Sequence, residues 1–253
     1  MNRNKKEHLK NVFLLILLMA LVLVAILSFI GIIKVYVVLA IEFGAIIIYL
    51  SIKSIINSRQ KKKANEKLLE ESKTYRSFKS TAEIEEWAIN KYGKSFLDEI
   101  KGCYPQNAED PHGIGWYKGN YFGFFNDFPQ SQQSKILNNY VNSFSLDENI
   151  IAYRFCSQDE YDFLFKQKNY FLERFLSTTL LPELFNGNII TKEKLIKIII
   201  PQNTHGLYLP NRSPNDLEFE ILLPCNLTIV YIGETEYNNN PIKTYIIRTQ
   251  GTI

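Results

Sequence analysis

The chain has 253 residues, of which 46% are hydrophobic, and a formal net charge of +3. Residues 1–73 hold 12 of the 29 basic and 5 of the 26 acidic residues, so residues 74–253 are mildly acidic and offer no electrostatic case for binding nucleic acid. The three cysteines and three histidines are dispersed, which argues against a disulfide framework, a cysteine–histidine protease and a metallohydrolase, and we expect no metal.

The N-terminal part has the composition of a membrane segment. Val12–Ile33 is an uncharged apolar run of 22 residues, long enough to cross a hydrocarbon core about 30 Å thick. A second apolar run, Val35–Ile52, is interrupted only by Glu42. One helix over both runs would be about 60 Å long. We therefore expect a turn near Gly31–Lys34 and a two-helix transmembrane hairpin within residues 1–55. A cleavable signal peptide is disfavoured, because the first run is too long and no small-residue cleavage site follows it.

Basic residues flank the two runs, and only Lys34 lies between them. This positive-inside pattern places both ends of the hairpin, and the domain that follows it, on the cytoplasmic side. Residues 56–74 are charged and lack Gly and Pro, which predicts a helical linker. The remaining residues, 75–253, form one domain by length.

Two helices are expected early in this domain. Ser80 offers an N-cap with Glu83 three residues on, followed by apolar residues at helical spacing and by Gly93 as the end. A second helix is expected over Ser131–Phe144. Between them, residues 103–128 are loop-rich and aromatic, and Lys118 is their only Lys or Arg. Core packing is the favoured interpretation of these aromatic side chains, with base stacking as the alternative.

After Leu146 the pattern becomes typical of β-structure, with one short helix at Asp159–Lys166. Helices followed by short strands predict an α+β fold, with N-terminal helices followed by packed β-sheets. The expected strands are Asn149–Phe155, Tyr170–Leu180, Glu193–Ile200, Gly206–Leu209, Leu217–Leu223, Asn226–Gly233 and Lys243–Arg248.

Glu218 and Glu220 open one of these strands. Side chains alternate along a strand, so both carboxylates should point to the same face. Desolvating two like charges on one face is costly, so the pattern suggests a functional pair. A short edge strand with glutamates on its wet face is the alternative.

Three motifs in this order resemble the Arg–Ser–Glu signature of bacterial mono-ADP-ribosyltransferase exoenzymes, which include the enzymatic components of binary toxins. They are Tyr153-Arg154-Phe155, Phe175-Leu-Ser177-Thr178-Thr179 and Glu218-Phe-Glu220-Ile-Leu-Leu, and Phe78–Trp87 and Pro201–Tyr208 also resemble family segments. The resemblance covers roughly residues 75–250 and implies an ADP-ribosyltransferase-like fold.

The resemblance implies an NAD-dependent mono-ADP-ribosyltransferase with NAD as substrate and no metal. Arg154 and Tyr153 would bind NAD, with the Arg154 guanidinium on its pyrophosphate or on the nicotinamide-side ribose. Ser177 would bind NAD and orient the catalytic glutamate. The next two residues would support the nicotinamide pocket; they are Thr178 and Thr179.

The two glutamates would divide the chemistry. Glu220 would stabilise the oxocarbenium-like cation as nicotinamide leaves. In the family, a Glu at the position of Glu218 implies transfer to a protein arginine, whose guanidinium needs a base. The expected partners are therefore a protein with an acceptor arginine and the membrane.

The sequence also departs from the family. Thr179 stands where many members have Ser, and Pro210–Leu217 lacks the aromatic residue that often contacts the target protein. An NAD glycohydrolase and a catalytically degenerate membrane-tethered interaction domain therefore remain alternatives. Because the family's toxins act outside their producer, a secreted or extracellular location is the alternative to a cytoplasmic one.

Overall fold

The computed structural model describes residues 3–29, 35–105, 109–119, 131–183, 194–211 and 218–248. The chain divides into two compact units, Met1–Ala64 and Asn65–Ile253. The turn expected at Gly31–Lys34 lies outside the described residues.

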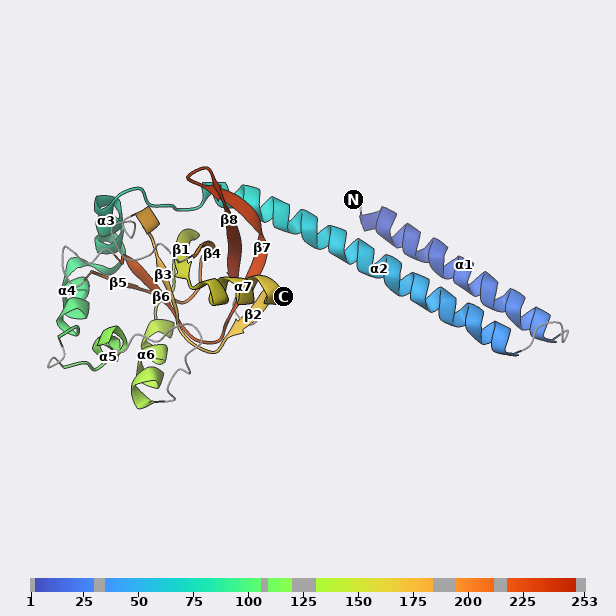
Figure 1. The fold of residues 1–253 in the computed structure, drawn as a ribbon, viewed down its shortest axis with the longest axis horizontal. Coiled ribbons are helices and arrows are strands. Elements are labelled where there is room, and N and C mark those ends of the chain that lie inside the picture. The colour runs from blue at the N-terminus through green and yellow to red at the C-terminus, as the bar shows by residue number, and fades with distance from the viewer. Residues whose placement is uncertain are drawn as a thin grey trace. The chain divides into compact units, whose positions relative to one another are not determined.

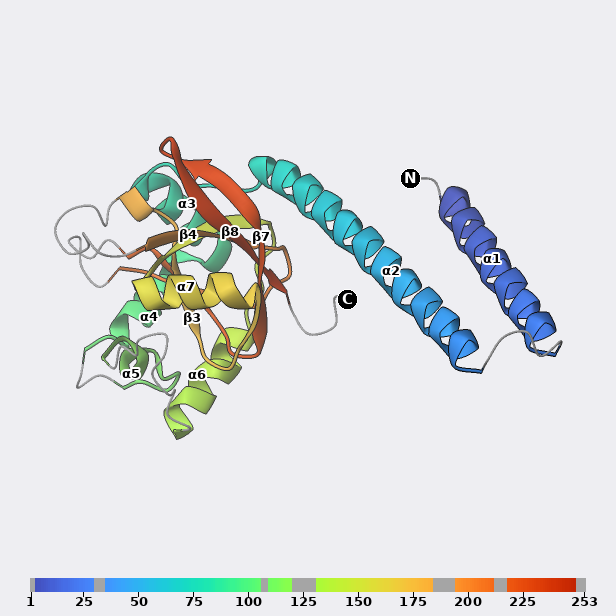
Figure 2. The same cartoon turned by 45° about the vertical axis from the view of Figure 1, so that its right-hand side comes forward.

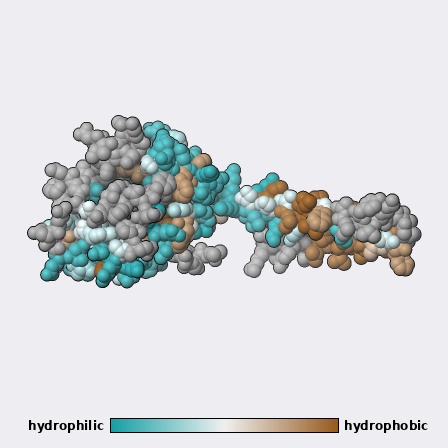
Figure 3. Space-filling model, turned by 60° about the horizontal axis from the view of Figure 1, so that its bottom comes forward, coloured by the Kyte–Doolittle hydropathy of each residue, from teal (hydrophilic) through white to brown (hydrophobic). Residues whose placement is uncertain are grey.

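The first unit contains α1 (Arg3–Phe29) and most of α2 (Val35–Glu71). Its large apolar side chains, such as Leu15, Met19 and Phe43, are exposed, and they gather as the hydrophobic surface seen in Figure 3. Within the described part of the chain, Ile41–Thr74 is long and apolar enough to cross a membrane by length and composition, and Leu14–Phe29 is a shorter apolar helix.

The second unit is an α+β domain, as predicted. Its described helices after the end of α2 are the 3-10 helix η1 (Ser72–Thr74), α3 (Thr81–Tyr92), α4 (Lys94–Gly102), α5 (Ile114–Gly119), α6 (Gln132–Asn142) and α7 (Gln158–Gln167). Its described strands are β1 (Ile150–Cys156), β2 (Asn169–Leu172), β3 (Leu176–Thr179), β4 (Lys194–Ile200), β5 (Leu207–Leu209), β6 (Glu220–Leu223), β7 (Leu227–Tyr237) and β8 (Asn240–Arg248).

The eight strands form one hydrogen-bonded sheet in the order β2-β7-β8-β4-β1-β3-β6-β5. The expectation of several packed sheets is therefore replaced by one mixed sheet, because β1 pairs on both edges and joins β4 to β3. Only β4 and β8 pair in parallel among these strands. Figure 1 shows α3, α4 and α5 at the β5 end of the sheet.

Alternating residues of β1 divide between two apolar clusters. Ile150, Ala152 and Cys156 join the main core, to which α3 and α7 also contribute. Ile151 and Tyr153 join a smaller cluster that includes the last turns of α2. A third cluster joins α4, α5 and α6 to β5 and β6. Figure 2 shows α7 lying across the strands. Three neighbouring strands of this sheet carry Arg154 (β1), Ser177 (β3) and Glu220 (β6).

The predicted start of α3 is confirmed in detail. The Ser80 hydroxyl accepts a hydrogen bond from the Glu83 amide at 3.3 Å, and the Glu83 carboxylate accepts one from the Lys79 amide at 2.8 Å. Gly93 follows the helix with φ of 82°, a conformation that favours glycine.

Three expected elements differ in the structure. Tyr170–Leu180 contains two strands, β2 and β3, with a bend between them. The aromatic region 103–128 contains the short helix α5 rather than loop alone. The strand expected from Leu217 begins only at Glu220, because Phe219 has φ of 40° and leaves the extended conformation.

Candidate active site

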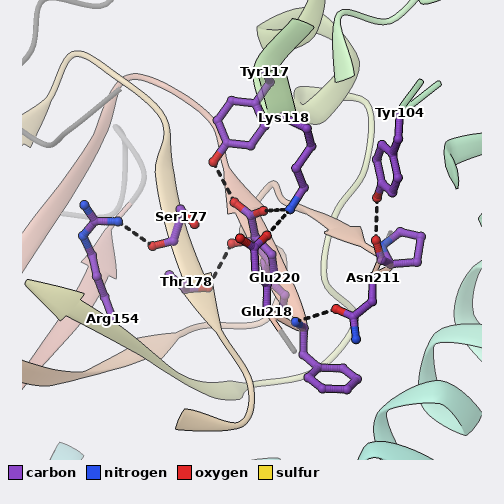
Figure 4. Close-up of polar contacts among 12 residues, drawn as sticks. Tyr104, Tyr117, Lys118, Arg154, Ser177, Thr178, Asn211, Glu218 and Glu220 are labelled. Carbon is purple, nitrogen blue, oxygen red and sulfur yellow. Dashed lines mark hydrogen bonds and ion pairs between the residues drawn. The ribbon is translucent and has the colours of Figure 1, made fainter. Parts of the chain in front are cut away.

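Three elements bring polar side chains together (Figure 4). Tyr117 and Lys118 are consecutive residues of α5, while Ser177 lies on β3 and Glu220 begins β6. The pairing of β3 with β6 sets Thr179 opposite Glu220 and Ser177 opposite Leu222. Ser177 and Glu220 therefore share one face of the sheet.

The residue between the two glutamates has an unusual backbone. Phe219 adopts the left-handed region, which is strained for a bulky residue and has to be stabilised by its surroundings. Its amide donates to Asn211 Oδ1 at 3.0 Å, its carbonyl accepts from the Leu180 amide at 3.1 Å, and its ring is buried. The chain is thus bent between the two glutamates.

Strand alternation does not explain how the glutamates are placed. Glu220 is buried in β6, whereas the Glu218 side chain before the bend is 48% exposed. The sequence predicted that strand alternation would place both glutamates on one face, and this is wrong because Glu218 lies outside the strand. A shared cation brings the two carboxylates together instead.

That cation is Lys118. Its Nζ donates to Glu220 Oε2 at 2.6 Å and also forms a short contact with Glu218 Oε2. The Lys118 side chain is 6% exposed and that of Glu220 is 4% exposed. Burial lowers the pKa of Lys118, but the two glutamates outweigh burial and raise it above its usual value. Lys118 is therefore a buried ammonium group.

Glu220 is surrounded by donors. Besides Lys118, the Tyr117 hydroxyl donates to Glu220 Oε1 at 2.7 Å, and the Ser177 hydroxyl also bonds this carboxylate. Burial alone would raise the pKa of Glu220, yet Lys118, Ser177 and Tyr117 together hold it below its usual value. Burial and the nearby Glu220 charge raise the pKa of Tyr117, so the phenol remains a neutral donor.

Arg154 is held on the other side of Ser177 (Figure 4). Its Nε and Nη2 donate to the two carboxylate oxygens of Glu160 at 2.6 and 3.3 Å, and its Nη1 donates to the Ser177 carbonyl at 2.9 Å. Arg154 and Glu160 are 8% and 3% exposed. One edge of the guanidinium is therefore occupied by a protein carboxylate.

The remaining predicted residues lie apart from the glutamates or act on the backbone. The Tyr153 ring lies against Tyr237, with ring centroids 5.0 Å apart. Thr178 Oγ1 donates to the Ile221 carbonyl at 2.9 Å, and Thr179 Oγ1 accepts from the Leu181 amide at 3.3 Å. Thr178 thus links β3 to β6, whereas Thr179 makes a local contact at the end of β3.

Sequence reasoning missed three residues of this site: Tyr117, Lys118 and Glu160. Lys118 was visible as the one Lys or Arg in an aromatic stretch, but its partners lie about a hundred positions away. Glu160 stands three residues after Ser157, the spacing of a helix N-cap pair. The Glu160 amide donates to Ser157 Oγ at 3.2 Å, as in such a pair, but the Glu160 carboxylate bonds Arg154.

Helix α5 is fixed firmly enough to present its two residues. The Asp110 carboxylate accepts hydrogen bonds from the amides of Ile114 and Trp116, both at 2.8 Å. Gly115 allows a close approach to α4, because a Cβ there would lie 2.1 Å from the Cys103 carbonyl oxygen. No group of three metal-ligating side chains occurs in the part of the chain that the structure describes.

Comparison with known proteins places this geometry in a family. Residues 117–252, more than half of the chain, match the ADP-ribosyltransferase exoenzyme family. The match includes Tyr117, Lys118, Arg154, Ser177 and both glutamates. No curated protein matches the sequence.

Solved structures of similar fold come from several bacteria. An ADP-ribosyltransferase from Clostridium botulinum has 22% sequence identity over 69% of this chain and 98% of its own, with a TM-score of 0.43. The ADP-ribosylating toxin BECa of C. perfringens, solved with NADH, has 15% identity over 69% of this chain and 50% of its own, with a TM-score of 0.49.

A third structure, from S. aureus and solved with NAD, has 14% identity over 70% of this chain and 99% of its own, with a TM-score of 0.45. The assignment of this protein depends on the family match over more than half of its length. The chain belongs to the ADP-ribosyltransferase exoenzyme family.

Proposed function

We propose that this protein is an NAD-dependent mono-ADP-ribosyltransferase that transfers ADP-ribose to a protein arginine. The observation that carries the proposal is the Glu218–Glu220 pair, in which one carboxylate is buried and the other is open to solvent. A buried carboxylate suits a cation formed within the site, and an exposed one suits a group that arrives from another protein.

Glu220 is proposed to act on the NAD side of the reaction. The bond between nicotinamide and ribose breaks with its electron pair passing to nicotinamide, and positive charge develops on the ribose. Because Lys118, Tyr117 and Ser177 hold the Glu220 pKa low, this residue is a carboxylate at neutral pH and can stabilise that charge. Glu220 also has the acceptor capacity to bind the ribose 2′-hydroxyl.

Glu218 is proposed to act on the acceptor. A guanidinium has a pKa above about 12 and is a poor nucleophile until it loses a proton. The exposed Glu218 carboxylate can orient the guanidinium and accept its proton while a guanidine nitrogen bonds to the ribose carbon. A neutral amide at position 218 would still orient the acceptor but would not supply this base.

Arg154, Tyr153, Ser177, Thr178 and Thr179 are proposed to form the NAD-binding side. The bidentate contact with Glu160 fixes the plane of the Arg154 guanidinium. A phosphate or ribose oxygen would bind at the edge formed by Nη1 and Nη2, where Nη1 also donates to the Ser177 carbonyl. The threonines would act indirectly: Thr178 fastens β3 to β6, and Thr179 fixes the backbone at the end of β3.

The N-terminal helices are proposed to anchor the protein in a membrane as a two-span hairpin within residues 1–55. The exposed apolar side chains of α1 and α2 support this proposal. The basic flanks favour a cytoplasmic catalytic domain, with a secreted location as the alternative. Protease protection of the domain in sealed membrane vesicles distinguishes the two.

The test uses the full chain in detergent micelles with labelled NAD and a small guanidine, agmatine, as acceptor. Glu220→Ala is expected to lower both nicotinamide release and label transfer by about 10²–10³-fold, the range seen when one transition-state contact is removed. Glu218→Gln is expected to abolish transfer while nicotinamide release continues. Glu236→Gln, an exposed position on β7, is the matched control and should retain both activities.

Each other outcome points to one alternative. Nicotinamide release without transfer to agmatine or to proteins of a cell lysate identifies an NAD glycohydrolase. The absence of NAD binding in calorimetry identifies a degenerate interaction domain. Full activity in Glu220→Ala contradicts the proposed role of this residue.

A further inference from the structure

The contact between Lys118 and the two glutamates has a chemical consequence beyond holding α5 in place. Glu218 and Glu220 carry two negative charges that meet at one ammonium group. Two carboxylates that contact the same group repel each other, and this repulsion raises a carboxyl pKa unless a cation offsets it. Lys118 provides that compensation and leaves the cluster with one net negative charge.

The other groups that face the pair cannot replace Lys118. Tyr117 on α5 and Ser177 on β3 are neutral donors to Glu220. Arg154 on β1 is paired with Glu160 on α7. Lys118 is thus the cation in direct contact with both carboxylates among the residues that the structure describes.

Lys118 is also placed for a specific role rather than by chance contact. Its side chain is only 6% exposed, although it belongs to a helix of six residues. The Asp110 cap and the close approach at Gly115 fix the helix that carries it. Burying the Lys118 ammonium group costs desolvation free energy that a solvated lysine would not pay.

We propose that Lys118 is a positioning residue of the transferase reaction, which holds Glu218 and Glu220 side by side as an ionised pair. This inference rests on the proposed function. Lys118 acts through the glutamates: it keeps Glu220 charged to meet the ribosyl cation and holds Glu218 beside it, where Glu218 can accept the acceptor proton.

The first experiment measures the pH profile of kcat/KM for nicotinamide release by the full chain in detergent micelles. Lys118→Met is expected to lower kcat/KM at pH 7 about tenfold or more and to move the acid limb up by about one pH unit or more, because an opposite charge at this range lowers a carboxyl pKa by that amount. Lys118→Arg should keep the acid limb near its wild-type position, because it keeps the cation.

Lys135→Met, which changes an exposed lysine on α6, is the matched control and should leave the profile unchanged. An acid limb that stays in place in Lys118→Met overturns the proposal. A rate that rises in this variant also overturns it, and would mean that Lys118 obstructs the site.

The second experiment needs no turnover. Thermal unfolding at pH 7 is compared between Lys118→Met and the double variant with Glu220→Gln. The double variant is expected to melt at a higher temperature, because the neutral amide removes the buried charge that Lys118 no longer compensates. An equal or lower melting temperature overturns the proposal.

The two experiments separate the possible failures. A wild-type chain that releases no nicotinamide overturns the proposed function, and with it any role of Lys118 in the reaction. Active wild-type protein without rescue in the double variant overturns the Lys118 proposal alone.

Discussion

Two buried ionic clusters lie on either side of Ser177, and they differ in their charge balance. Arg154 and Glu160 form a one-to-one pair, both buried, with three hydrogen bonds from the guanidinium. Lys118 serves two carboxylates, one of which remains 48% exposed. The charges of the first cluster, here called the closed pair, balance each other. The second cluster, here called the open cluster, retains one negative charge and is exposed to solvent at Glu218.

This difference predicts different responses to the loss of one charge. In the balanced pair, removing Glu160 leaves the buried Arg154 guanidinium uncompensated, which is strongly destabilising. A cluster with unbalanced charge attracts a cation, and in the proposed function this is the ribosyl cation or the acceptor guanidinium. The position of Ser177 between them, with its carbonyl bonded to Arg154 and its hydroxyl to Glu220, couples the two.

Breaking the closed pair should have the largest effect on stability. Glu160→Gln removes the charge that compensates buried Arg154 and is expected to reduce the free energy of unfolding by about 3–5 kcal/mol. Asp159→Asn, one residue earlier on the exposed side of α7, should change it by less than about 0.5 kcal/mol. Chemical denaturation of both variants measures the difference; equal stabilities would show that the pair is not needed for folding.

Removing Lys118 from the open cluster should reverse the effect of falling pH on the stability that Glu220 contributes. In the wild type the Glu220 pKa is lowered, so its contribution to stability is present above the unfolded value of about 4.3 and is lost as pH falls through the lower folded value. In Lys118→Met, burial dominates and raises that pKa. This variant, destabilised by about 3 kcal/mol at pH 7, should recover stability relative to the wild type as pH falls from 7 to 5.

Thermal melts at three pH values test this sign. A stability gap between Lys118→Met and the wild type that stays constant over this range would contradict the assignment of Glu220 as the compensated charge.

Moving α5 should weaken the second cluster without touching its charges. Gly115→Ala forces a Cβ against the Cys103 backbone and is expected to cost about 1–3 kcal/mol of stability, with lower NAD turnover as α5 shifts. Gly119→Ala, at the other end of the same helix, meets nothing within 4 Å and serves as the control. Similar losses in both variants would indicate a general helix effect instead.

The smallest stability effect is expected at the open side. Glu218→Gln should change the free energy of unfolding by less than about 0.5 kcal/mol, because Glu218 is half exposed and Lys118 keeps its contact with buried Glu220. The same variant should lose transfer to agmatine. A large loss of stability would mean that Glu218 is structural rather than a partner of the acceptor.

Local patterns predicted the parts of the fold that depend on local rules. The cap at Ser80 and the strand over Asn149–Phe155 depend on residues within a few positions of one another, and both occur in the structure. The sequence placed Arg154, Ser177 and Glu220 on strands but did not predict how those strands pair. In the structure β3 lies between β1 and β6 and pairs with both.

The unpredicted features depend on contacts between distant segments. Helix α5 has six residues, too few for a periodic signal, and it is positioned by Asp110 and by packing on Cys103. The Lys118 contacts join residues about a hundred positions apart. The left-handed Phe219 depends on Asn211 from another segment, so a β-like sequence gave no sign of the bend.

The bend at Phe219 gives two neighbouring glutamates different surroundings. In a regular strand, positions 218 and 220 would share one face. Here the backbone turns between them, so Glu218 is half exposed while Glu220 is enclosed. With the roles proposed above, acceptor preference can drift in evolution through position 218, provided that the replacement leaves the contact between Lys118 and Glu220 in place.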